Sequence, residues 1–154
     1  MQPRILRALA IVILIAPTLA LASTAALWLP TLPATIPVQW SSNGVSATAP
    51  TPVLVVGLGA ITALASVIGI ATVRGARTAE QLLASRRAVT ACAAVAGAAS
   101  AVWISCAALS LGGAPVSSTE VGGWPLLALT AGLAWGALPA LLLSAAGGRE
   151  RATA

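Results

Sequence analysis

Chemically reactive side chains are scarce in this chain, and those present lie far apart. The sequence contains no His, Asp, Lys or Tyr, and its acidic residues are Glu80, Glu120 and Glu150. General acid–base and nucleophilic mechanisms need a base held close to the reacting atom. The three glutamates fall in separate segments outside the apolar runs. We therefore expect a protein that is not an enzyme, with no catalytic residue.

The two cysteines, Cys92 and Cys106, are the next candidates for chemistry. On one helix they would lie about 21 Å apart, whereas a disulfide needs Cα atoms within about 7 Å of each other. A structural zinc site needs about four ligands, and the chain offers no His. We expect both thiols to serve as small packing residues, with no metal and no cofactor.

The elements that carry these residues are strongly apolar. Hydrophobic residues make up 58% of the 154 residues and charged residues 7%, whereas a soluble domain has about 25% charged residues. No charged residue occurs from Ala8 to Val73, and only Glu120 occurs from Ala88 to Gly148. Runs of about 20 apolar residues can cross a hydrocarbon core of about 30 Å. The composition predicts an all-α integral membrane protein.

Prolines and charges divide the sequence into four transmembrane helices, which we expect to form a single membrane domain, 1–154. Pro17 is expected to kink the first helix, as lipid-embedded helices tolerate. Thr78 and Gln81 fit a capping box, so the third helix should begin near Ala79, ahead of its span. The expected spans are 8–29, 53–73, 88–111 and 124–146, joined by loops 30–52, 74–87 and 112–123 and followed by a tail, 147–154.

The positive charges predict the orientation of the helices. Cytoplasmic loops are enriched in Lys and Arg, which places both termini in the cytoplasm and the loops 30–52 and 112–123 outside. The arginines lack the interleaved aromatic residues of a nucleic-acid site, so we expect contact with anionic lipid and no nucleic acid. All eight precede the first span, separate the second from the third, or follow the fourth: Arg4, Arg7, Arg74, Arg77, Arg86, Arg87, Arg149 and Arg151.

The N-terminus also has the features of a secretory signal peptide. A basic start and an apolar stretch lead to Ala20-Leu21-Ala22, which fits the small-x-small cleavage pattern. Apolar character continues to Leu29, which is long enough for a full span, so we favour an uncleaved helix. The rest of the topology is the same in either case.

Small residues recur at every fourth position of the fourth expected helix. Such a stripe lets helices approach closely in lipid, where little else drives their association. We favour packing within the bundle over self-association, because the third helix has a similar series, Ala93, Gly97 and Ala101. The stripe comprises Ala128, Gly132, Gly136, Ala140 and Ser144.

The loop 30–52 is unusual for a connection between two spans. Its prolines restrict the backbone to extended conformations. Residues 35–40, TIPVQW, alternate like a strand, and Asn43-Gly44 favours a two-residue hairpin turn from which residues 45–48, VSAT, return antiparallel. We expect a compact external hairpin with Trp40 packed against the helix ends.

Six positions of this loop resemble a known motif: Pro33, Ile36, Pro37, Gln39, Trp40 and Gly44. They are similar to the "LP…IP-x-H-W/F-N…G" signature of a bacterial membrane domain found at the N-terminus of SdpI-like immunity and signalling proteins. The resemblance implies a small protein of the bacterial plasma (inner) membrane that acts by binding, in immunity, sensing or signalling. Its partner would be another membrane protein, a secreted peptide or a second copy. Gln39 replaces the family's His, so we expect no response of the loop to pH near neutrality.

Two other functions compete with this interpretation. The small-residue stripe could dock the protein as an accessory subunit of a transporter or another membrane complex. A channel or carrier acting alone is the weakest hypothesis, because no expected span contains a charged residue.

Overall fold

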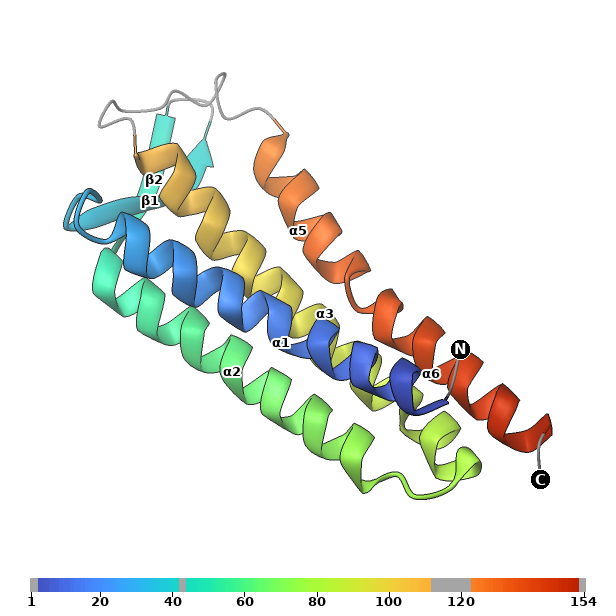
Figure 1. Ribbon diagram of the computed structural model, residues 1–154. Helices are drawn as coiled ribbons and strands as arrows, with labels where there is room; N and C mark the ends of the chain where they lie inside the picture. The colour runs from blue at the N-terminus through green and yellow to red at the C-terminus, as the bar shows by residue number, and fades with distance from the viewer. Residues whose placement is uncertain (1–2, 42–43, 112–122, 153–154) are drawn as a thin grey trace.

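The computed structural model describes residues 3–41, 44–111 and 123–152, which form a helical bundle with a small sheet at one end (Figure 1). Within them, four helical stretches are long and apolar enough to cross a membrane. The predictions of four such helices and of a hairpin between the first two are confirmed. In chain order the elements are α1 (Pro3–Trp28), β1 (Thr35–Ser41), β2 (Gly44–Pro50), α2 (Thr51–Gly75), α3 (Ala79–Ser110), α5 (Trp124–Ala134) and α6 (Ala137–Ala152).

Helix α3 occupies the middle of the bundle and packs against α1, α2, α5 and α6. Of its most apolar stretch 50% is buried, against 22–28% in the other three stretches. Small side chains make this central position feasible, because they let neighbouring helices approach on several sides. The buried positions of α3 include Ala93, Ala96, Gly97, Ser100 and Ala107.

Many large apolar side chains are exposed on the outside of the bundle, whereas several small polar ones lie inside it. On α2, the exposed fractions of Val56, Leu64 and Val67 are 69%, 62% and 62%, while Thr62 and Ser66 are buried. The Ser66 hydroxyl donates to the Leu14 carbonyl of α1 at 2.7 Å. The bundle interior is therefore held together by close approach and hydrogen bonds as well as by apolar contact.

The start of α3 has the predicted capping box. The Thr78 hydroxyl accepts a hydrogen bond from the Gln81 amide at 3.2 Å, and the Gln81 side chain accepts from the Thr78 amide at 3.4 Å. The helix begins at Ala79, as predicted. The other helices also extend past the expected spans, because polar and charged residues at their ends remain helical.

The fourth expected span, 124–146, is present as one apolar stretch, Pro125–Gly148, but its helix is interrupted. It breaks at Trp135 and Gly136 into α5 and α6, and α6 continues to Ala152 through most of the expected tail. Pro139 explains the break, because it has no amide hydrogen to donate to the Trp135 carbonyl four residues earlier. That carbonyl instead accepts from the Leu138 amide at 3.2 Å, a tighter turn.

Pro17 removes a helical hydrogen bond in α1 in the same way, and a distant residue replaces it. In a regular helix the amide of residue 17 would donate to the Ile13 carbonyl, but proline has no amide hydrogen. The indole Nε1 of Trp135 donates to that carbonyl at 3.0 Å. The helix α1 therefore continues through Pro17, and its middle is fastened to the α5–α6 junction.

Candidate functional site

The hairpin closes one end of the bundle and lies within the expected loop 30–52. Strands β1 and β2 pair antiparallel, from Thr35 opposite Pro50 to Ser41 opposite Gly44. The register shifts on both sides of Gln39, and such bulges bend and twist a ribbon locally. The irregular pair contacts α3 through β1 and α2 through β2, so it lies on the helix ends (Figure 1).

Two apolar side chains of the motif anchor the hairpin. Ile36 is fully buried in a cluster with Leu21, Trp103 and Ala107, and Trp40 is half-buried against the same cluster. Trp28, at the end of α1, also packs there. The cluster itself is fixed by a hydrogen bond from the Trp103 indole Nε1 to the Thr24 hydroxyl at 2.9 Å. The packing of Trp40 against the helix ends thus agrees with the prediction for the loop.

Thr51, which the sequence interpretation did not single out, ties the loop to α2. Its hydroxyl donates to the Pro33 carbonyl at 2.6 Å, and its amide donates to the Ala34 carbonyl at 2.9 Å. Because the residue is 3% exposed, these bonds are shielded from solvent. The available signal in the sequence was a hydroxyl residue next to Pro52 at the start of a helix.

The prediction that Gly44 belongs to the turn is wrong, because Gly44 pairs with Ser41 and is the first residue of β2. Asn43, the other predicted turn residue, lies outside the described residues. Gly44 nevertheless needs to be glycine, because its φ of 110° is a conformation that side chains with a Cβ rarely adopt.

The outer side of the hairpin is uncharged. Gln39, Val45, Thr48 and Pro33 are exposed and Pro37 is half-buried, and none of them carries a charge. Gln39, at the position where the motif has His, is exposed and is not part of the buried cluster. The motif therefore divides into anchors, Ile36 and Trp40, and an accessible surface.

The Trp40 indole differs from the indoles of Trp103 and Trp135. Its Nε1 is buried and has no hydrogen-bond partner among the described residues, whereas Trp103 and Trp135 both donate. The anchoring by Trp40 thus rests on apolar packing alone.

The small residues of the fourth expected helix face α3. A Cβ on Gly132 would lie 2.6 Å from the Gly97 carbonyl oxygen, and one on Gly136 would lie 2.7 Å from the Thr90 carbonyl oxygen. Ala140 is half-buried, and its carbonyl accepts from the Ser144 hydroxyl at 2.8 Å. The two glycines of the stripe are therefore packed inside the bundle: Gly132 meets Gly97 of the predicted series, whereas Gly136 meets Thr90 and Ala94.

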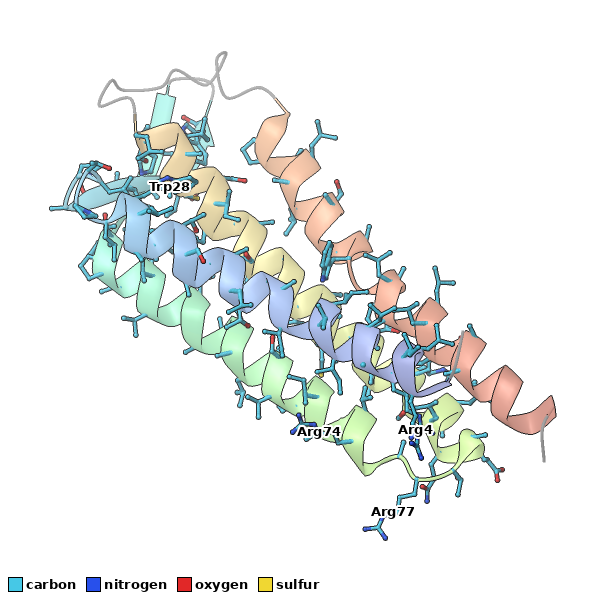
Figure 2. All side chains as sticks on the ribbon, in the orientation of Figure 1. Arg4, Trp28, Arg74 and Arg77 are labelled. Atoms are coloured by element: carbon cyan, nitrogen blue, oxygen red, sulfur yellow. The ribbon has the colours of Figure 1, made fainter. Side chains whose placement is uncertain are left out.

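Charge gathers at the end of the bundle opposite the hairpin, which we call the arginine end. Figure 2 shows Arg4, Arg74 and Arg77 there, whereas Trp28 lies at the hairpin end. Some of these groups also join helices: Arg7 donates to the Ala76 carbonyl at 3.0 Å, and Arg86 to the Ser144 hydroxyl at 3.1 Å. The described part of the hairpin carries no charge at all.

No reactive constellation forms within residues 3–41, 44–111 and 123–152. They contain no group of three or more His, Cys, Asp or Glu residues placed to hold a metal ion. Cys92 and Cys106 are both free. Glu120 and the rest of the expected loop 112–122 lie outside the described residues. Comparison with family models, with curated proteins and with solved structures gives no match to this chain.

Proposed function

We propose that this is a small non-enzymatic protein of a bacterial plasma membrane, which acts by binding a partner at its hairpin. The four apolar helices and their outward-facing Val, Leu and Ile side chains support a location in lipid, since water would penalise so much exposed apolar surface. The arginine end supports an orientation with both termini in the cytoplasm and the hairpin outside.

The observation that carries the binding role is the construction of the hairpin. Joining α1 to α2 would need only a few residues, yet this connection forms two paired strands fixed by Ile36, Trp40 and Thr51. Ordering a segment costs about 1–2 kcal/mol per residue in backbone entropy. A connection that is ordered at this cost provides a fixed, uncharged surface, which a binding partner can recognise.

A secreted peptide fits this surface better than a charged ligand. Among the described residues β2 pairs only with β1, and β2 has no proline before Pro50, so its backbone amides suit an added strand. The exposed side chains beside it, Val45 and Thr48, are apolar or neutral. We therefore favour immunity, sensing or signalling in the manner of SdpI-like proteins.

The accessory-subunit alternative has less support. It depended on a free small-residue stripe, but Gly132 and Gly136 lie against α3. Docking of a larger membrane partner would have to use another surface.

Survival of the source bacterium tests the proposal. A strain lacking the gene should become sensitive to the peptides in culture supernatant from its own siblings, and the intact gene should restore survival. Thr48→Asp places a charge on the outer side of the hairpin and should not restore it. Ala84→Asp adds the same charge at an exposed position of the arginine end and should restore it fully.

Membrane abundance of each variant is measured in parallel, so that loss of protein is not mistaken for loss of binding. Unchanged survival of the deletion strain would contradict the immunity role. Full restoration by Thr48→Asp would contradict recognition at the hairpin.

A further inference from the structure

A lateral groove lies between α1 and α5, with α3 as its floor. Helix α6 packs on both α1 and α3, whereas α5 packs mainly on α3, and Figure 1 shows α5 diverging from α1 toward the hairpin end. The divergence starts at the break before Pro139. The groove has a volume of about 440 Å³, within the ~300–1,000 Å³ range of ligand sites.

The lining of the groove combines small apolar residues with two serines. It includes Ala20 of α1, Ala101 of α3 and Ala131 of α5, and it ends at Pro17 and Trp135. Because most of its lining residues are small, the groove offers a narrow apolar channel along α3.

The two serines of the lining, Ser100 and Ser105, are each 4% exposed. Neither hydroxyl forms a hydrogen bond within the described residues. Buried helical hydroxyls elsewhere in the bundle are bonded, as when Ser110 donates to the Cys106 carbonyl at 2.7 Å and Thr62 to the Leu58 carbonyl at 2.7 Å. Both serines line the groove, and a hydroxyl without a partner in an apolar groove costs free energy, so these two point to a ligand with an acceptor.

The position of the groove along the bundle suggests what that ligand is. Pro17 lies about 15 Å along α1 from Arg7, near the middle of a hydrocarbon core of about 30 Å. Ser105 lies about 27 Å along α3 from Arg87, close to the boundary of the core at the hairpin end. The groove therefore extends over one leaflet, from its boundary to the midplane.

We propose that the groove holds one acyl chain of a glycerophospholipid from the leaflet at the hairpin end, with the ester carbonyl accepting from the Ser105 hydroxyl. The chain fills the apolar channel down to Trp135, and its carbonyl lies where ester groups lie in a bilayer. This inference rests on the proposed insertion into a membrane and adds a specific lipid site to it.

Photolabelling tests the site. The full-length protein is placed in phosphatidylethanolamine–phosphatidylglycerol vesicles that contain a little phosphatidylglycerol with a diazirine in one acyl chain. Adducts should concentrate on the groove residues of α3 and α5 and should be competed by unlabelled phosphatidylglycerol. Ala131→Leu fills the groove and should lower this saturable labelling by about tenfold or more.

Ala134→Leu is the matched control, because it adds the same side chain to an exposed alanine of α5 outside the groove. It should leave saturable labelling unchanged. Equal labelling in Ala131→Leu and the parent protein would overturn the groove site. Labelling of Val56 and Val67 on the outer face of α2 reports insertion alone. If they are labelled and the groove is not, only the lipid site is wrong; if nothing is labelled, the membrane proposal fails as well.

The carbonyl contact is tested separately with an ether-linked phosphatidylglycerol, which lacks ester carbonyls. It should compete about two- to tenfold less well than the ester lipid against the parent protein. Ser105→Ala should abolish that difference without changing the labelled positions. Equal competition against the parent protein would overturn the role of Ser105. Native mass spectrometry measures the oligomeric state. A dimer in the parent protein that is lost in Ala131→Leu would assign the groove to a second copy of the chain and would contradict the lipid site.

Discussion

At the scale of single residues, two prolines and one tryptophan define the middle of this bundle. Pro17 leaves the Ile13 carbonyl of α1 without its helical donor, and Pro139 does the same to the Trp135 carbonyl. The Trp135 indole satisfies the first of these acceptors. The residue at which the fourth helical stretch is interrupted, Trp135, is therefore also the residue that bonds this stretch to α1.

A double-mutant cycle should isolate the hydrogen bond from Trp135 to Ile13. Trp135→Phe leaves the carbonyl unpaired and should lower the free energy of unfolding in detergent by about 1–2 kcal/mol. In a Pro17→Ala background the restored amide can donate to Ile13, so the same change should lower the unfolding free energy much less. The expected coupling is about 1 kcal/mol, measured by thermal or denaturant unfolding.

Trp40→Phe is the control for this cycle, because the Trp40 Nε1 has no partner among the described residues. It removes a buried donor that is unsatisfied, and should change stability less than Trp135→Phe does. Additive effects of Trp135→Phe and Pro17→Ala would show that the indole and the amide do not serve the same carbonyl.

At the scale of helices and strands, the contact between α3 and the fourth expected helix depends on the absence of side chains. Gly97 and Gly132 oppose each other backbone to backbone. Lipid is as apolar as the helices, so close backbone approach has to supply much of the attraction. The break at Trp135 keeps this contact while letting α5 leave α1.

A single methyl group should therefore disturb this contact. A Cβ on Gly136 would lie 2.7 Å from the Thr90 carbonyl oxygen and 2.8 Å from the Ala94 Cβ, and overpacking costs about 1–3 kcal/mol. We expect Gly136→Ala to lower the melting temperature in detergent. Gly57→Ala, where nothing lies within 4 Å of the new Cβ, should be neutral or stabilising by up to ~1 kcal/mol. Equal melting of the two variants would contradict the α3 contact.

Local patterns in the sequence were enough to predict most of these elements, but not how they meet. The apolar runs, the capping box at Thr78 and the strand alternation of residues 35–40 act over a few residues, and each was found as expected. The break before Pro139 was missed, because a proline within an apolar run can be either tolerated or disruptive. Its outcome here depends on packing against α3.

At the scale of the whole molecule, all described charged side chains belong to the arginine end, and the hairpin end is neutral. Such an asymmetry orients a protein during insertion, because positive segments are retained in the cytoplasm. The long-range hydrogen bonds and the groove could not be predicted from the sequence. Residues far apart in the chain form them, and no short pattern specifies which helix lies beside which.

Reporter fusions should reveal the orientation. A reporter active only in the cytoplasm should work at residue 80 and after Ala154, because both positions follow arginine-rich segments. A reporter active only outside should work at residues 45 and 118. External activity at residue 80 would contradict the proposal of four membrane spans with both termini inside. Fusions at residues 45 and 80 that report the same compartment would contradict the span assigned to α2.

The hydrogen bond between Trp135 and Ile13 joins residues that are 122 positions apart. During synthesis the two residues are therefore made at different times. Ribosomes add about 5–20 residues per second, so the Ile13 carbonyl is made roughly 6–24 s before its donor. Throughout that interval, α1 has an unsatisfied acceptor at its middle, which water or a neighbouring protein must cover. Only when the last helix arrives can the Trp135 indole take over this acceptor.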